Sequence, residues 1–234
     1  MSEPSGQAHL AEALRQCASE PIHRLGLIQP HGVLLAMDDA DFRITHVSGN
    51  LGALLDREPG TLLGTPLADW LGAARVAALR ATPGIGDWRN EAIIDLAVPG
   101  PLGTRVHDAR LSRNGRHWLL EIELDDTRDT DLFQGLFIPI RDALWQLDAV
   151  HDLALYTQRV AQQVRLLTGF DRVMMYRFDA NWDGEVIAES KADGQESYLG
   201  NRFPASDIPP QARELYTRNL IRLIADVEAV PVPL

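Results

Sequence analysis

The sequence predicts an α+β protein with two consecutive domains, each built from antiparallel strands and helices. Three observations support this prediction. Short runs of aliphatic and β-branched residues alternate with turn residues along much of the 234-residue chain, as antiparallel strands do. A charged segment poor in helix formers, residues 125–131, separates two halves that each have their own strands. A helical repeat of apolar residues over 143–168 precedes the second group of strands.

We therefore expect residues 1–20 to form a polar arm and residues 21–125 a first domain. Residues 126–131 would be a linker, and residues 132–234 a second domain. Within the arm, Ala8 to Gln16 favours a short helix.

Five strands are expected in the first domain, with short helical pieces between the second and the third. The expected strands are Val33–Met37, Phe42–Val47, Ala92–Val98, Thr104–Leu111 and His117–Leu124. From Asn50 to Arg80, glycine and proline residues punctuate the helical pieces. Asn114-Gly115 suits a tight hairpin turn between the last two strands, because both central residues of such a turn take positive φ.

The second domain should begin with a long helix, Ala143 to Thr168, that ends at Gly169. Its apolar residues recur at three- and four-residue steps once Thr157 is admitted, and they are Val150, Leu153, Val160, Val164 and Leu167. This face has two possible partners. It covers the sheet of its own domain, or part of it pairs with a second copy of the chain.

Further elements follow that helix. The expected elements are a hairpin of Arg172–Phe178 with Gly184–Ser190, a loop from Tyr198 to Pro209, a helix from Pro210 to Asn219, and a strand over Ile221–Asp226. A proline is tolerated in the first turn of a helix, because the N–H that it lacks would have no partner there.

Composition excludes several classes of function. The formal charge of −11 argues against nucleic acid and against an anionic membrane surface as partners. No apolar stretch approaches the roughly 20 residues that span a bilayer. The single cysteine cannot form an internal disulfide, which favours a reducing, cytoplasmic location. The histidines show no metal-ligand spacing, and no phosphate loop, nucleophile elbow or kinase signature is present, so we expect neither a metal site nor an enzyme.

The most informative segment is the heptapeptide from Phe203 to Pro209, Phe-Pro-Ala-Ser-Asp-Ile-Pro. Each of its two prolines disfavours the helical conformation at the residue before it, here Phe203 and Ile208. The result is a stiff turn that presents carbonyl groups and the carboxylate of Asp207 at a fixed place. Such a turn suits a rigid ligand with several N–H donors.

Two motifs carry a resemblance to a known family. Cys17 followed by Pro21-Ile22-His23 and Ile28-Gln29-Pro30-His31-Gly32 resembles the amino-terminal segment of bacterial phytochromes that use biliverdin. The run from Pro204 to Pro209 resembles the chromophore-pocket motif of that family. The resemblance extends from Cys17 to Leu234. It implies a five-stranded PAS domain followed by the amino-terminal part of a GAF domain. The remaining strands of the GAF sheet and the pocket histidine would lie in sequence beyond Leu234.

The resemblance also implies a chemistry. Cys17 would attach biliverdin, a linear tetrapyrrole, as a thioether through addition of its sulfur to a vinyl group. The backbone carbonyl of Asp207 would accept from pyrrole N–H groups, and its carboxylate would stabilise the pigment cation. Without the motif, Cys17 would be an inert thiol and Asp207 a cap for the helix at Pro210.

Other residues would complete the pocket by the same resemblance. Met174 and Tyr176 share one face of a strand and would border the ring that rotates in light. The remaining members of the implied site are Tyr198, Phe203, Ser206, Ile208, Pro209, Tyr216 and Arg222. Arg222 resembles the arginine that binds a propionate group, because a guanidinium matches a carboxylate in bidentate fashion. Without the resemblance, the apolar members would be ordinary core residues, and Arg222 would form an ion pair at the surface.

The favoured hypothesis is thus part of a red/far-red photoreceptor. It would dimerise through residues 143–168 and signal to a downstream domain, typically a histidine kinase, or to a response regulator. Two alternatives remain open: a light-independent interaction module that dimerises through the same helix, and a thiol redox sensor that uses Cys17.

Overall fold

The structure, a computed structural model, divides by its internal contacts into two compact units. The described residues are 12–13, 15–17, 19–22, 25–55, 58–82, 91–124, 130–218 and 221–234. The five-stranded unit comprises residues 23–127 and 221–234, and the three-stranded unit comprises residues 1–22 and 128–220. The change of unit near residue 127 lies in the charged segment. The last 14 residues, however, contact the five-stranded unit, whereas we expected them in the second domain.

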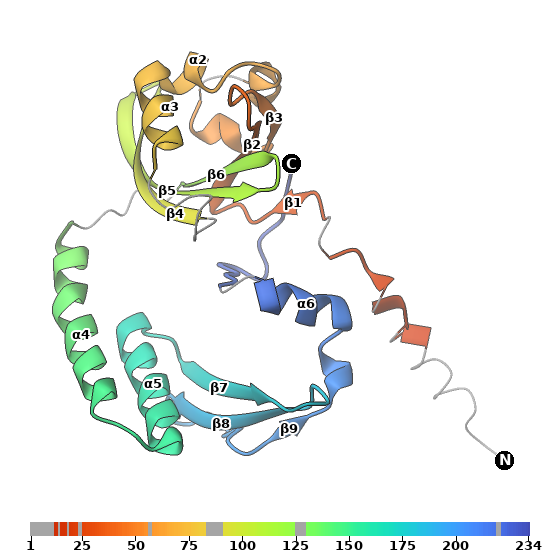
Figure 1. The fold of residues 1–234 in the computed structure, drawn as a ribbon, viewed down its shortest axis with the longest axis vertical. Coiled ribbons are helices and arrows are strands. Elements are labelled where there is room, and N and C mark those ends of the chain that lie inside the picture. The colour runs from red at the N-terminus through yellow and green to blue at the C-terminus, as the bar shows by residue number, and fades with distance from the viewer. Residues whose placement is uncertain are drawn as a thin grey trace. The chain divides into compact units, whose positions relative to one another are not determined.

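The five-stranded unit contains the predicted antiparallel sheet, with strand order β3-β2-β6-β5-β4 (Figure 1). Its strands are β2 (Gly32–Asp38), β3 (Ile44–Val47), β4 (Glu91–Gly100), β5 (Gly103–Asn114) and β6 (His117–Glu123). Its helical segments are η1 (Leu51–Ala53), η2 (Pro59–Leu62), α2 (Ala68–Leu71) and α3 (Ala73–Arg80). The α+β fold and the element order that we predicted for this part of the chain are therefore confirmed.

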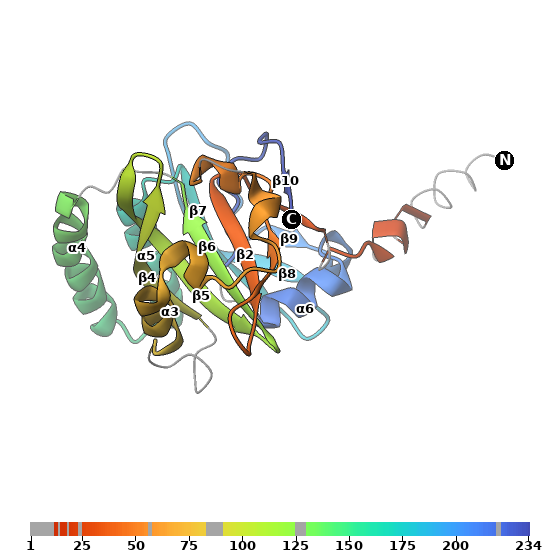
Figure 2. The same ribbon diagram turned by 90° about the horizontal axis from the view of Figure 1, so that it is seen from above.

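The core of this unit lies between the sheet and these helical segments (Figures 1 and 2). Alternate residues of β6, namely Trp118, Leu120 and Ile122, are buried, and the residues between them are more exposed. This period of two is expected for a strand with one face on a core. Leu71 of α2 is fully buried in the same cluster.

Two details differ from expectation. The second strand begins at Ile44, because Phe42 has a positive φ of 55° that no strand can accommodate. The turn between β5 and β6 is formed by Gly115 and Arg116, since Asn114 still pairs with His117. Only Gly115 of these residues takes positive φ, at 61°.

The carboxyl end of the chain lies against the same unit. β10 (Val232–Pro233) pairs with β1 (Leu27–Ile28). The strand predicted at Ile221–Asp226 is absent, which is a correction. Its backbone instead bonds to a side chain: Gln29 Oε1 accepts from the N–H groups of Ala225 (3.1 Å) and Asp226 (3.3 Å). An amide side chain thus takes the place of a neighbouring strand.

The three-stranded unit contains the predicted hairpin and one short additional strand, in the order β7-β8-β9. Its elements are α4 (Thr130–Asp148), α5 (Leu153–Thr168), β7 (Arg172–Phe178), β8 (Gly184–Lys191), β9 (Arg202–Phe203), η3 (Ala205–Asp207) and α6 (Pro210–Arg218). Of the short helix expected over 8–16, only residues 12–13 and 15–16 are described, and they are helical.

The single helix predicted over 143–168 is wrong, because two helices occupy that region. Asp152 has extended backbone angles and caps α5, with its carboxylate accepting from Leu155 N at 2.8 Å. An aspartate in the middle of an apolar repeat therefore started a new helix. Gly169 ends α5 as predicted, in the left-handed conformation with φ of 71°.

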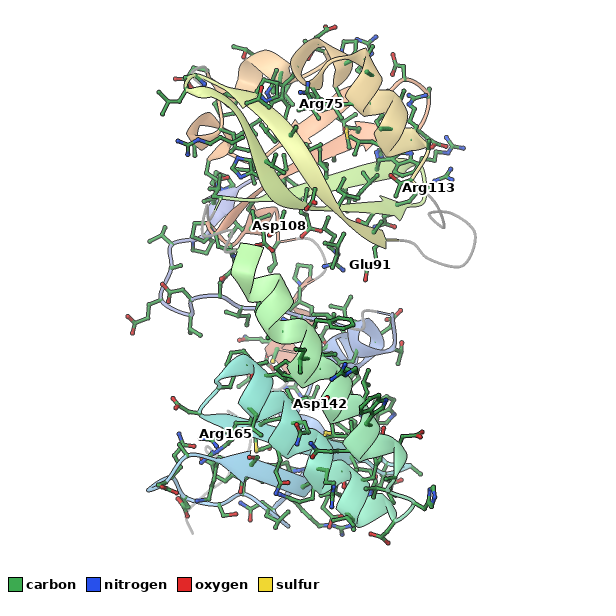
Figure 3. The ribbon with its side chains drawn as sticks, turned by 90° about the vertical axis from the view of Figure 1, so that its left-hand side faces the viewer. Arg75, Glu91, Asp108, Arg113, Asp142 and Arg165 are labelled. Carbon is green, nitrogen blue, oxygen red and sulfur yellow. The ribbon has the colours of Figure 1, made fainter. Side chains whose placement is uncertain are left out.

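α5 packs on the sheet of its own unit through small residues. Thr157 and Ala161 are buried, whereas Leu153 of the predicted apolar face is 64% exposed. α4 lies beside α5, and Gln163 Nε2 donates to Gln146 Oε1 at 3.2 Å between them. Figure 3 shows the two helices side by side, with Asp142 on α4 and Arg165 on α5.

Candidate functional site

The turn between β9 and α6 has the stiff geometry that its prolines predict. Phe203 is in a strand, and Ile208 has extended angles of −122° and 105°. Between them a single helical turn is closed by a hydrogen bond from Asp207 N to Pro204 O at 3.0 Å. The carboxylate of Asp207 is exposed and, among the described residues, receives no hydrogen bond and does not cap α6.

A carboxylate from the preceding hairpin fixes this turn. Asp183 Oδ1 accepts from Ala205 N at 2.8 Å. Asp183 is itself oriented by Asp179, whose Oδ1 accepts from Asn181 N at 2.8 Å and from Asp183 N at 3.0 Å. The hairpin loop and the turn that carries Asp207 are consequently held together.

Aromatic side chains cluster beside the turn. The ring of Tyr176 lies 5.0 Å from that of Phe178 and 6.1 Å from that of Phe203, measured between centroids. Met174, two residues before Tyr176 on β7, is 42% exposed, and Tyr176 is 36% exposed. Both residues therefore lie on a face of the sheet that its own unit leaves accessible.

The phenol of Tyr176 is close to two carboxylates. Partial burial, which disfavours the charged phenolate, raises the pKa of Tyr176, and the negative charges of Asp207 and Asp183 raise it further. The tyrosine is consequently a neutral hydrogen-bond donor well into alkaline solution. A donor and an anionic acceptor thus stand side by side at this face.

A second polar cluster holds the loop that contains Tyr198. Glu189, whose side chain is 4% exposed, accepts from Ser197 Oγ at 2.6 Å and from Tyr198 N at 3.1 Å. Arg172 Nε lies 3.4 Å from Glu189 Oε1, and its guanidinium covers the Tyr198 ring at 4.2 Å. The hydrogen bond from Ser197, those from the loop backbone and the charge of Arg172 lower the pKa of Glu189.

The arm that carries Cys17 is attached to α6. Gln211 Nε2 donates to the backbone carbonyl of Cys17 at 2.5 Å and lies 3.5 Å from Glu20 O. Cys17 is exposed. Gln211 follows Asp207 by four residues, so one short stretch of chain holds both the turn and the arm. Gln211 Oε1 is buried and has no hydrogen-bond partner among the described residues.

The other predicted site residues are distributed unevenly. Ile208 and Pro209 are half-buried in the turn, Ser206 is exposed there, and Tyr216 on α6 is 44% exposed. Arg222 belongs to the five-stranded unit, where it is exposed and has no ion pair within the described part of the chain. The three-stranded unit thus brings together all the predicted site residues except Arg222.

Sequence reasoning missed several residues that organise this site, namely Asp183, Gly184, Glu189 and Gln211. The sequence places Asp183 only in the loop of the predicted hairpin, and Glu189 only in its second strand. A carboxylate one residue before a strand, followed by glycine, is a weak signal at best. Their roles depend on contacts with segments far along the chain, which no local pattern records.

Comparison with known proteins gives consistent matches. The PAS fold family model matches residues 17–125. The chain is 40% identical to the chromophore-binding domain of an unusual bacteriophytochrome, RpBphP3, from R. palustris, with a TM-score of 0.80, covering 93% of this chain and 70% of that one. The chain belongs to the bacteriophytochrome family. The wild-type chromophore-binding domain of Stigmatella aurantiaca phytochrome P1 is similar at 39% identity, with a TM-score of 0.80 and coverage of 93% and 72%.

Full-length phytochromes extend well beyond the matched region. The chain is 40% identical to a bacteriophytochrome of Xanthomonas campestris pv. campestris, over 93% of this chain but 34% of that protein. It is 39% identical to cyanobacterial phytochrome B of Nostoc sp., over 94% of this chain and 29% of that protein. The chain thus spans about a third of the length of these relatives. Among the described helices, none is long and apolar enough to cross a membrane.

Proposed function

We propose that this bacteriophytochrome chain is the pigment-binding part of a red/far-red photoreceptor, with biliverdin attached covalently at Cys17. One observation carries the proposal: the hydrogen bond from Gln211 to the Cys17 carbonyl places the thiol-bearing segment beside the helix that follows the Asp207 turn. The sequence motifs alone left the distance between these two segments open.

The residues present fit a flat, cationic pigment with apolar edges. Asp207 offers an exposed carboxylate that receives no hydrogen bond from the described residues. Met174, Tyr176, Tyr198 and Tyr216 offer accessible apolar or aromatic surface in the same unit, with exposed fractions of 42%, 36%, 36% and 44%. A carboxylate beside the pigment favours the protonated, cationic form of the pigment, because opposite charges attract most strongly where water is excluded.

Attachment requires no oxidant. The Cys17 thiol adds across a vinyl C=C bond: an S–C bond forms, the π bond breaks, and the thiol proton goes to the other vinyl carbon. The reactive form is the thiolate, and exposure of Cys17 gives it access to the vinyl group. When bound, biliverdin supplies light absorption and isomerisation about a double bond. Tyr176 and Asp207 then serve as the donor and the anion whose contacts with the pigment change.

The test is direct. The chain is incubated with biliverdin, denatured, separated by electrophoresis and stained with zinc, which makes covalently attached bilins fluorescent. We expect a fluorescent band for the wild-type chain and none for Cys17→Ala. An equally fluorescent band from Cys17→Ala would refute attachment at this residue. Absence of a band from the wild-type chain would refute covalent binding by this chain.

We also propose that the chain forms a homodimer. The interface expected over residues 143–168 is here assigned to α4, which overlaps that range only in its last turns. Phe137, Ile138, Leu144 and Trp145 are between 54% and 66% exposed. Because residues seven apart lie on the same face of a helix, these four form one apolar stripe. Arg141, between the two pairs, covers the Trp145 ring at 4.9 Å. A stripe of this kind is complementary to itself, as the interface of a two-fold dimer must be.

Trp145→Glu tests this interface by placing a charge in the stripe. We expect the wild-type chain to sediment as a dimer and Trp145→Glu as a monomer with unchanged pigment attachment. Leu102→Glu is the control, because Leu102 is 83% exposed in the other unit. A wild-type monomer at high concentration would exclude the dimer, and a dimeric Trp145→Glu would exclude this stripe.

The signal would pass to a downstream domain or response regulator of the longer receptor.

A further inference from the structure

Gly184, the first residue of β8, lies directly against the ring of Tyr176. A Cβ atom built at Gly184 would be 2.0 Å from Tyr176 Cζ and Oη and 2.1 Å from Cε1. Real side chains do not tolerate such distances, so even a methyl group would displace the ring. The φ of Gly184 lies outside the left-handed region, and other residues could adopt this backbone. Glycine is therefore required here for space and not for conformation.

The strand pairing explains why the ring lies there. Gly184 pairs with Phe178 on one side and with Phe203 on the other. The rings of these two neighbours are the ones that Tyr176 contacts, with centroids at 5.0 Å and 6.1 Å. The Tyr176 ring thus lies over Gly184 and between the rings of Phe178 and Phe203. If a side chain at Gly184 displaced the Tyr176 ring, the ring would also lose its contact with Phe178 or Phe203.

The residue before this glycine acts on the other half of the site. Asp183 Oδ1 holds Ala205 N at 2.8 Å and so fixes the turn that ends at Asp207. Consecutive residues at the start of β8 consequently determine where the Tyr176 phenol and the Asp207 carboxylate lie. This arrangement gives Gly184 a role beyond packing.

We propose that Gly184 is a positioning residue that, by lacking a side chain, seats the Tyr176 phenol beside the Asp207 turn and thereby sets the surroundings of the bound pigment. The placement of the phenol is a property of the protein alone. Only its consequence for the pigment rests on the proposed function.

A double-mutant cycle in the pigment-free chain tests the placement. Gly184→Ala, Tyr176→Ala and the double variant are unfolded in urea and compared with the wild-type chain. The methyl group meets the far end of a half-exposed tyrosine ring, which can move, so the folded-to-unfolded ratio should fall about fivefold, the low end for overpacking. In the Tyr176→Ala background the same methyl meets no ring, so we expect a change of less than about twofold. Gly135→Ala in α4 is the control for a glycine-to-alanine change without a clash: nothing lies within 4 Å of a Cβ there, and the change should not destabilise the chain, because alanine favours helix more than glycine does.

Each outcome of the cycle is informative. If Gly184→Ala does not fold but the double variant does, the clash with Tyr176 is the cause and the proposal stands. If neither folds, or if the methyl group is equally costly in both backgrounds, Gly184 has another role and the proposal fails. A Gly184→Ala chain as stable as the wild-type chain also overturns it.

The consequence for the pigment has a spectroscopic readout. In biliverdin-loaded chains, Gly184→Ala should shift absorption and fluorescence yield in the same direction as Tyr176→Ala, and the double variant should match Tyr176→Ala alone. Spectra of Gly184→Ala identical to wild type, with Tyr176→Ala altered, would contradict the proposal. If the wild-type chain binds no biliverdin, the proposed function fails, and the unfolding cycle still decides whether Gly184 seats Tyr176.

Discussion

Replacement of Gln211 by methionine should slow attachment of biliverdin to Cys17 without changing the thiol itself. Gln211 Nε2 donates to Cys17 O at 2.5 Å, and this bond joins the arm to α6. Methionine has a similar length and shape but no N–H donor, so the substitution removes the bond and leaves the packing of α6 largely intact.

The size of the effect follows from the single bond that is lost. A hydrogen bond between neutral groups contributes about 0.5–1.5 kcal/mol net. If that energy holds the arm in the reactive position, its loss lowers the attachment rate about 2- to 12-fold. The weak second contact, at 3.5 Å to Glu20 O, adds little.

The assay follows covalent attachment with time at saturating biliverdin, by zinc fluorescence of denatured samples. At saturating biliverdin every chain has pigment bound, so the attachment rate reports the placement of the arm and not the affinity for the pigment. Because the chain has one cysteine, its rate of alkylation by iodoacetamide reports the intrinsic reactivity of Cys17, which we expect to be unchanged. Gln163→Met is the matched control, since Gln163 bonds to Gln146 and not to the arm.

A wild-type attachment rate in Gln211→Met would refute the reasoning, because the arm would then not depend on α6. An equal decrease in Gln163→Met would assign the effect to general destabilisation of the unit.

Three further predictions concern stability and ionisation. Leu120→Ala should reduce the free energy of unfolding by about 2–5 kcal/mol in urea titrations, because Leu120 is fully buried in the core. The pKa of Glu189 is lowered in the folded chain, chiefly by the hydrogen bond from Ser197. Ionised Glu189 therefore stabilises the fold at pH values above its unfolded pKa, near 4.5. This stabilisation is lost as the pH falls through the lower pKa of the folded chain. Ser197→Ala should therefore raise the pKa of Glu189, as NMR titration of the carboxyl carbon would show. Asp207→Asn should lower the raised pKa of Tyr176 only in part, because burial is the larger cause, and ultraviolet titration of the tyrosines can measure this.

The outcomes that contradict them are equally specific. An unfolding free energy of Leu120→Ala within about 0.5 kcal/mol of wild type would remove that residue from the core. An unchanged carboxyl titration in Ser197→Ala would mean that Ser197 does not stabilise the Glu189 anion. Since the pKa of Tyr176 is raised, its contribution to stability is complete below pH 10 and declines above it, and a Tyr176→Phe chain with the same alkaline unfolding curve as wild type would contradict that assignment.

Much of the fold could be predicted from local pattern. The strands of the five-stranded sheet and the hairpin of β7 and β8 were predicted to within a few residues, because alternation of apolar side chains is set by which face meets a core. The short strand β9 lies in a segment that was predicted as a loop. The helix boundary at Asp152 was missed, although its side chain is a strong N-cap. The apolar repeat continues across Asp152 and favours a single helix, but the cap begins a new helix there.

Errors were greatest where distant segments meet. Ile221–Asp226 has the composition of a strand, yet its backbone is bonded by the side chain of Gln29, nearly the whole length of the chain away. No local pattern could indicate that partner. The same applies to Gln211, whose role depends on the arm, and to Gly184, whose lack of a side chain has meaning only beneath Tyr176.

The sequence by itself determined the family motifs, the strands of the five-stranded sheet and the stiffness of the proline-bounded turn, because each depends on residues close together in the chain. Only the tertiary structure decided that the Cys17 arm lies against α6 and that Asp183 holds the Asp207 turn. It also decided that the phenol of Tyr176 is seated on a glycine. Those contacts join segments that are apart in the chain, and they form only when the strands, loops and helices of the three-stranded unit pack together, which short-range propensities do not specify.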